Sequence, residues 1–214
     1  MLTQINDIRS IIFDLDGTLY HAPGIAQEIE RGAEELVAES RGLSIGQARS
    51  LLRCARQRLS ELHDEEPTLT RTCMELGIEI RDFHLGLQRR VRPERHLGND
   101  PILFALLDSL RDNFDLYLYT NNNLQLTRKI LALLGVDELF TRLYTIEFTW
   151  VPKPDRASLL RMLEDIGGPP ESFLCVGDRQ QVDLNVAASL GIPTLLVRDT
   201  SDLLQIHKMI GIIP

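Results

Sequence analysis

Four short groups of polar residues in this sequence could do chemistry together. They are Asp14-Leu15-Asp16-Gly17-Thr18, Tyr119-Thr120-Asn121, Pro152-Lys153-Pro154, and Gly177-Asp178 with Asp183 five residues after Asp178. Asp14, Asp16 and Asp178 would bring several carboxylates to one place, and like charges that close repel one another unless a cation lies among them. Because this set offers oxygen ligands and neither cysteine nor histidine, it favours Mg²⁺.

The same groups predict a type of reaction. A carboxylate held beside Mg²⁺ can attack an electrophile as a nucleophile. The hydroxyl of Thr120, the amide of Asn121 and the ammonium of Lys153 could then hold phosphate oxygens, and Lys153 would also offset the acidic charge. Taken singly, each group could be a turn, a loop or a helix cap. All four together, in this order, favour a functional site.

The elements that must position these groups alternate between strands and helices. Short apolar runs predict strands at residues 9–14, 114–119, 143–147, 172–176 and 194–197, and helical periodicity predicts helices at 101–111, 123–134, 155–166, 180–190 and 200–210. Such alternation implies an α/β fold, here a Rossmann-like core with a parallel sheet wrapped by helices. In an open parallel sheet, active residues gather at the carboxyl ends of the strands. The polar groups follow predicted strands or lie in an adjoining loop.

One stretch interrupts this alternation directly after the first strand. Residues 24–96 carry helical patterns only, with candidate helices at 25–40, 44–62, 67–76 and 80–91. We therefore expect a core of residues 1–20 and 97–214 with an inserted all-helical domain of residues 21–96. An insert above the strand ends can close over a substrate and supply specificity contacts. His21, Arg53, Arg56 and Arg71 are the candidates for such contacts.

Composition excludes several classes of protein. The 214 residues include 23 basic and 31 acidic ones, a net charge of −8, which is opposite to the balance of a nucleic-acid binder. No apolar run is long enough to cross a bilayer, and the first ten residues lack the apolar segment of a signal peptide. The three cysteines are widely spaced, as expected in a reducing compartment. We expect a cytoplasmic monomer or homodimer without nucleic-acid or membrane partners.

The four groups resemble the motifs of the haloacid dehalogenase superfamily, in its Mg²⁺-dependent phosphatase branch. Phe13-Asp14-Leu15-Asp16-Gly17-Thr18-Leu19 resembles the first motif, Leu118-Tyr119-Thr120-Asn121 the second, Lys153-Pro154 the third, and Val176-Gly177-Asp178 with Asp183 the fourth. The insert lies where this superfamily places a helical cap. Within it, the chain is most similar to the pyrimidine 5′-nucleotidase-like and phosphoglycolate phosphatase-like subgroup. The segments that carry this likeness are Gly17-Thr18-Leu19-Tyr20, Thr68-Leu69-Thr70-Arg71 and Leu134-Gly135-Val136 with Leu139-Phe140.

The resemblance implies a role for each candidate residue. Asp14 would be the nucleophile and would form an aspartyl-phosphate. Asp16 would protonate the leaving oxygen and then deprotonate the attacking water, while its backbone carbonyl would reach Mg²⁺. Asp178 would complete the metal site, and Asp183 would orient Lys153 or a water of that site. This division suits phosphoryl transfer, which needs charge neutralisation and in-line geometry above all.

We therefore expect a Mg²⁺-dependent phosphomonoesterase that acts on a small phosphorylated metabolite, with a nucleoside monophosphate as the first guess. Phosphoglycolate or a sugar phosphate as substrate, and phosphomutase chemistry, stay open. Asp16 and Gly177-Asp178 favour phosphate over a haloacid, since a dehalogenase needs neither Mg²⁺ nor an acid at this position. Two readings of a different class are a phosphorylatable switch and a catalytically silent binding protein. The large insert argues against the switch, and the complete motif set argues against the silent protein.

Overall fold

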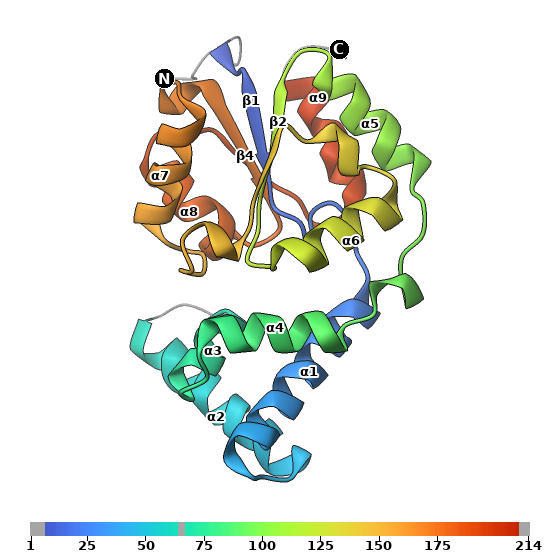
Figure 1. Ribbon diagram of the computed structural model, residues 1–214. Coiled ribbons are helices and arrows are strands. Elements are labelled where there is room, and N and C mark those ends of the chain that lie inside the picture. Colours follow the sequence, from blue (N-terminus) through green and yellow to red (C-terminus); the bar gives the residue numbers. More distant parts are fainter. Residues whose placement is uncertain (1–6, 64–66, 210–214) are drawn as a thin grey trace.

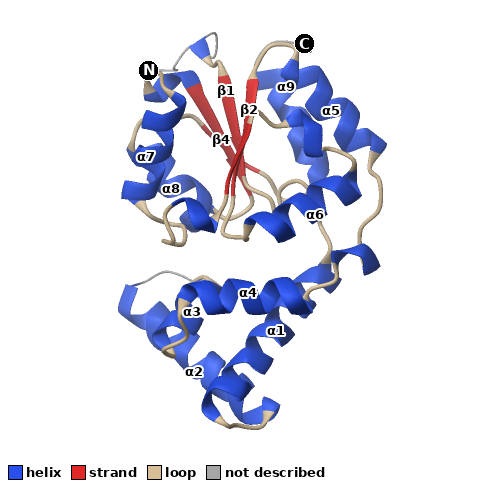
Figure 2. Ribbon diagram, in the orientation of Figure 1, coloured by secondary structure: helices blue, strands red, loops and turns tan. Residues whose placement is uncertain are grey.

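A computed structural model describes residues 7–63 and 67–209 and places a parallel sheet at their centre (Figures 1 and 2). The strand order is β3-β2-β1-β4-β5. The strands are β1 (Ser10–Phe13), β2 (Asp115–Tyr119), β3 (Arg142–Tyr144), β4 (Phe173–Gly177) and β5 (Thr194–Leu196). Phe13 of β1 is paired with Leu118 of β2 and with Val176 of β4. The three central strands therefore end at the same edge of the sheet, and their following loops begin side by side.

Helices cover both faces of the sheet, which explains why the central strand β1 is apolar throughout. Ile11 and Phe13 belong to one hydrophobic cluster, and Ile12 belongs to another. The first cluster includes residues of α5 (Pro101–Arg111), α6 (Leu124–Leu134) and α9 (Gln205–Met209). The second includes residues of α7 (Arg156–Ile166) and α8 (Asn185–Ser189). This is the α/β sandwich that the alternation in the sequence predicts.

Four further helices form a separate body below the carboxyl ends of the strands (Figure 1). They are α1 (Pro23–Arg41), α2 (Ile45–His63), α3 (Leu69–Glu75) and α4 (Ile80–Arg90). Buried Val37, Ala48 and Phe83 belong to its packed interior. We propose that residues 21–96 form this cap domain. Within the described ranges, no helix has the length and apolar character needed to span a membrane.

Three expected elements differ from the structure in their detail. The expected strand 143–147 ends at Tyr144, because the Ile146 amide turns to donate to the Asn122 carbonyl (3.1 Å) and Ile146–Phe148 form a 3₁₀ turn. The expected helix 180–190 begins as a wide π turn, Gln180–Leu184, before α8. The last expected helix starts as a 3₁₀ turn, Thr200–Leu204, capped by Asp199; its expected final residue, 210, lies outside the described part of the chain.

Candidate active site

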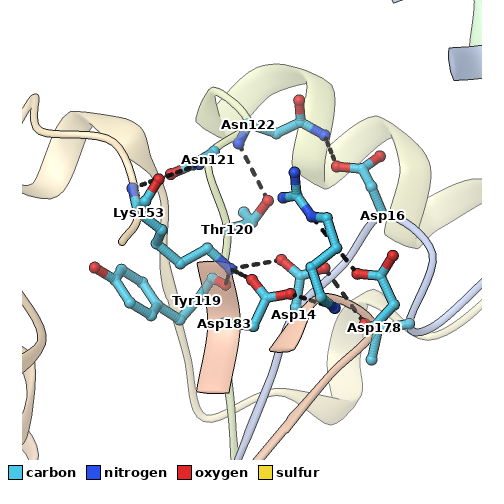
Figure 3. A network of polar contacts seen from close by, with 11 residues as sticks. Asp14, Asp16, Tyr119, Thr120, Asn121, Asn122, Lys153, Asp178 and Asp183 are labelled. Atoms are coloured by element: carbon cyan, nitrogen blue, oxygen red, sulfur yellow. Dashed lines mark hydrogen bonds and ion pairs between the residues drawn. The ribbon is translucent and has the colours of Figure 1, made fainter. Parts of the chain in front are cut away.

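The polar groups identified in the sequence meet at the carboxyl edge of the sheet (Figure 3). Asp14 directly follows β1, Thr120 directly follows β2, and Asp178 directly follows β4. Backbone hydrogen bonds extend the pairing one residue beyond the strands: the Asp14 amide donates to Val176 O (2.9 Å), and the Thr120 amide donates to Tyr144 O (2.9 Å). The strand register therefore fixes where these side chains start.

Lys153 is buried in the middle of the site. Its ammonium donates to Asp14 Oδ1 (2.6 Å), to Asp183 Oδ1 (2.8 Å) and to the Tyr119 carbonyl (2.8 Å). These three acceptors match the three hydrogens of an ammonium group. Burial alone would lower the pKa of Lys153, but the charges of Asp14 and Asp183 outweigh it and raise that pKa. Lys153 is therefore a permanent cation in this site.

The two carboxylates beside Lys153 differ in their electrostatic balance. Burial raises the pKa of Asp14 despite the nearby charge of Lys153. Burial acts in the same direction on Asp183, but the charges of Lys153 and Arg179 outweigh it and lower the pKa of Asp183. Asp183 Oδ2 also accepts a hydrogen bond from the Arg179 amide (3.1 Å). Asp183 is thus a fixed carboxylate that orients Lys153.

Asn121, from the group Tyr119-Thr120-Asn121, positions the loop that carries Lys153. Asn121 Oδ1 accepts from the Lys153 amide (2.7 Å), and Asn121 Nδ2 donates to the Lys153 carbonyl (3.3 Å). The Asn121 side chain, expected as a phosphate ligand, is therefore engaged with the backbone of Lys153. Thr120 Oγ1 accepts from the Asn122 amide (3.1 Å), which leaves the hydroxyl hydrogen of Thr120 able to donate to a phosphate oxygen.

Two hydrogen-bond donors hold the Asp16 carboxylate. The Tyr20 hydroxyl donates to Asp16 Oδ1, and Asn122 Nδ2 donates to Asp16 Oδ2 (2.6 Å). Burial, together with the charge of Asp14, raises the pKa of Asp16 to about 6. An acid with this pKa can both give and take a proton near neutral pH. The Asp16 carboxylate is therefore engaged by two donors, and the place of Asp16 in a metal site with Asp14 and Asp178 stays a prediction.

A different set of three carboxylates could hold a metal ion. Asp14, Asp178 and Asp183 each present an oxygen, and the three oxygens lie within 4.8 Å of one another. Asp178 Oδ1 is buried without a hydrogen-bond partner. The Nε atom of Arg179 lies 4.0 Å from it. Burial and the charges of Asp14 and Asp183 raise the pKa of Asp178 to about 7. An all-oxygen donor set with one unpartnered carboxylate oxygen fits Mg²⁺.

Gly17 makes room for this arrangement. Its φ angle is +86°, in the left-handed region that favours glycine. A Cβ atom at this position would lie 2.4 Å from Asp178 Oδ2. The glycine of the first group thus allows the backbone after Asp16 to pass directly against a carboxylate from β4.

Asn122 is a site residue that the motif analysis did not single out, and nothing in the sequence indicates that Tyr20 would contact Asp16. Tyr20 follows the first motif, and Asn122 follows Thr120-Asn121, so both lie next to recognised positions. The sequence offers no signal that they share a partner, because 106 positions separate Asn122 from Asp16. Only the pairing of β1 with β2 brings them together.

A cavity of about 390 Å³ connects this edge of the sheet with the cap. On the core side it is lined by Asp16, Gly17, Asn121, Asn122, Asp178 and Arg179. The cap linker and cap helices supply the remaining wall, namely Tyr20, His21, Ala22, Pro23, Ile25, Ala26, Ile29, Glu30, Thr68, Leu69, Thr70, Phe83, His84 and Leu87. A molecule bound at the carboxylates would extend into this space.

The four cap candidates named from the sequence lie in different places. His21 lines the cavity. Arg56 donates to Glu30 Oε1 (2.7 Å) and lines a neighbouring cavity. Arg71 Nη2 donates to the Pro154 carbonyl (2.8 Å) and so joins the cap to the loop that carries Lys153, while Arg53 is exposed on α2. The structure therefore brings one of the four, His21, to the cavity wall.

Comparison with known protein families and sequences gives a consistent picture. A family model described as haloacid dehalogenase-like hydrolase matches residues 8–191. A phosphoglycolate phosphatase from Escherichia coli O157:H7 is 26% identical over an alignment of 214 positions. This alignment covers 91% of this chain and 82% of that protein. The phosphoglycolate phosphatase of Salmonella typhimurium gives the same identity and coverage.

Solved structures share the fold. The HAD-hydrolase YfnB from Bacillus subtilis, solved bound to magnesium, aligns with a TM-score of 0.60 at 19% identity and covers 95% of this chain and 99% of its own. A HAD phosphatase from Thermococcus onnurineus also has a TM-score of 0.60, at 18% identity, with coverage of 95% and 98%. At these identities the likeness concerns the architecture of core and cap.

Proposed function

Because the chain belongs to the haloacid dehalogenase-like hydrolases, we propose that it is a Mg²⁺-dependent phosphatase that hydrolyses the monoester of a small phosphorylated metabolite. The observation that carries this proposal is the buried Asp14 carboxylate, which Lys153 holds at the end of β1 beside Asp178 and Asp183. A carboxylate fixed in this way is a nucleophile with its charge already balanced.

The relatives support a phosphatase and one of the substrates that the sequence left open. Those described above are named phosphoglycolate phosphatases, which favours testing phosphoglycolate among the candidates. The nucleoside monophosphate favoured from the sequence has no such support and stays a hypothesis. Asp16 supports phosphate ester chemistry, since an acid beside the nucleophile can protonate an alcohol that leaves.

The first half of the proposed reaction transfers the phosphoryl group to the protein. An Asp14 oxygen attacks phosphorus, the bond between phosphorus and the ester oxygen breaks, and Asp16 gives its proton to that oxygen as the alcohol leaves. Asn122 and Tyr20 hold the Asp16 carboxyl in place for this step. The Thr120 hydroxyl would donate to a negative oxygen of the phosphoryl group, and the nearby positive charge of Lys153 would stabilise the charge that develops there.

The second half releases inorganic phosphate. Asp16, now ionised, takes a proton from a water molecule that attacks the aspartyl-phosphate, and the Asp14 carboxylate is restored. Asp14 and Asp178, with the Asp16 backbone carbonyl, would hold Mg²⁺, while Asp183 would keep Lys153 directed at Asp14. When bound, Mg²⁺ would supply positive charge that allows a phosphate dianion to approach these acids.

Phosphate release from a panel of esters tests this function. The panel contains nucleoside monophosphates, phosphoglycolate, sugar phosphates and an aryl phosphate, each assayed with Mg²⁺ and with EDTA. We expect release that requires Mg²⁺ and that Asp14→Asn abolishes. Asp108→Asn is the matched control, because it makes the same change at a half-exposed carboxylate on α5. Activity that persists in Asp14→Asn, or no release by folded wild type, would refute the proposal.

A further inference from the structure

The cavity beside the carboxylates is where the organic part of a bound phosphate ester would lie. Asp16, the acid assigned to the leaving oxygen, lines it together with Asn121 and Asp178. From this edge the cavity reaches the cap, which Figure 1 shows facing the carboxyl ends of the strands. The lining of the cavity therefore selects the alcohol that the reaction releases.

The cap wall of this cavity is mostly apolar. Ile25, Ile29, Leu69, Phe83 and Leu87 all line it. Three of them, Ile25, Phe83 and Leu87, are buried, and the other two pack against the same hydrophobic cluster. A methylene of the substrate that is buried against such a wall strengthens binding by about fourfold.

The charged groups that line the cavity do not suit an anionic alcohol. Asp16, Glu30 and Asp178 are acids, and Arg179 is the guanidinium among the described lining residues. Arg179 is surrounded by acids: the charges of Asp183, Asp14 and Asp178 raise its pKa against the effect of burial. Asp16, Asp178 and Arg179 lie at the phosphate end of the cavity, where the proton of Asp16 and a bound Mg²⁺ would offset the acids. On the cap side, the described lining residues include no arginine or lysine. A second negative charge on the substrate would therefore lie there unpaired, and an unpaired charge is costly to desolvate.

The other basic side chains near the cavity do not supply a partner for a carboxylate either. Arg56 is paired with Glu30 through a 2.7 Å hydrogen bond. His21 is exposed at the start of the cap linker. His84 is buried, and burial lowers its pKa to about 4, so its imidazole is neutral near neutral pH. Neither ring nitrogen of His84 has a hydrogen-bond partner, which leaves it able to contact an uncharged polar group.

From this wall we propose, building on the phosphatase function above, that the preferred substrate is the phosphate monoester of a neutral and largely apolar alcohol. The apolar cap residues contact the body of the alcohol, and the described lining on the cap side has no arginine or lysine to pair with a carboxylate. This assignment separates the chain from its relatives named phosphoglycolate phosphatase, since glycolate carries a carboxylate. It also leaves the phosphate-binding end of the site unchanged.

Three esters of nearly equal size test the charge preference directly. Ethyl phosphate, phosphoglycolate and O-phosphoethanolamine have two-carbon alcohols that are neutral, negative and positive. We expect kcat/KM for ethyl phosphate to exceed that for phosphoglycolate by at least about tenfold, because the carboxylate would be buried unpaired. We also expect kcat/KM to rise by about fourfold for each methylene from ethyl to butyl phosphate. Phosphoglycolate or O-phosphoethanolamine as the best of the three, or a flat alkyl series, would overturn the proposal.

A variant of the cap wall makes the test independent of the absolute activity. Ile29→Lys adds a cation to the wall, and Ile29→Met is the neutral control of similar length. In Ile29→Lys we expect the ratio of kcat/KM for phosphoglycolate to that for ethyl phosphate to rise at least about tenfold, while Ile29→Met leaves it unchanged. An unchanged ratio in folded Ile29→Lys would show that the alcohol does not contact this wall. Absence of hydrolysis of every ester would instead refute the phosphatase function itself.

Discussion

Acid should destabilise this protein through one buried histidine in the cap. His84 is 2% exposed and neither of its ring nitrogens has a hydrogen-bond partner. Burial lowers its pKa from 6.5 to about 4, although the carboxylate of Glu147 acts in the opposite direction. At pH values between these two pKa values, His84 is therefore protonated in the unfolded chain and unprotonated in the folded chain.

The sign and size of the effect follow from this difference. A folded pKa below the unfolded one makes the contribution of His84 constant above pH 6.5 and increasingly unfavourable as the pH falls towards 4. Relative to pH 8, the free energy of unfolding should fall by about 2 kcal/mol at pH 5 from this residue alone. At pH 4 the loss should reach about 3 kcal/mol.

Urea unfolding of wild type and His84→Leu between pH 8 and pH 5 measures this contribution. The variant should gain about 2 kcal/mol relative to wild type over that range, since leucine removes the titratable group from a similar volume. Leu107→Ala is the control: it loosens packing at a fully buried position of α5, in the core and not in the cap, so its destabilisation should not change with pH. Parallel pH profiles for wild type and His84→Leu would refute the argument.

Three further variants test the geometry of the site. Gly17→Ala should raise the Mg²⁺ concentration for half-maximal activity, because a Cβ would lie 2.4 Å from Asp178 Oδ2; an unchanged Mg²⁺ titration would contradict this. Tyr20→Phe should lower kcat/KM about tenfold for alkyl phosphates and less for an aryl phosphate, which needs little proton donation; equal losses would show that Tyr20 does not position Asp16. Asn123→Ala should cost about 1 kcal/mol in urea unfolding, because Asn123 Oδ1 caps α6 at the Leu126 amide (2.9 Å); unaltered stability would argue against this cap.

The ends of most elements could be predicted because local chemistry marks them. Pro101 begins α5 after the capping residue Asp100, whose side chain accepts from the Ile102 and Leu103 amides. Gly135 ends α6 with a φ of +78°. The wide turn at Gln180–Leu184 could not be predicted in this way. Asp183 within it is directed at Lys153, a partner 30 positions away in the sequence.

The sequence by itself determined the chemistry available to this protein. Residue type and spacing are local properties, so the sequence could predict the fold class, and it predicts Asp14, Lys153 and Asp178 as site residues and magnesium as the metal. The helices between the first and second strands could be predicted for the same reason, since helical periodicity needs no distant partner.

Only the tertiary structure decided which groups face one another. It directs the Asp16 carboxylate to Tyr20 and Asn122 and groups Asp183 with Asp14 and Asp178. It also leaves Arg53 on the surface of the cap. Contacts of this kind depend on strand register and on the packing of the cap against the core. Both bring together residues that are far apart in the chain, so the spacing of residues along the sequence does not predict these contacts.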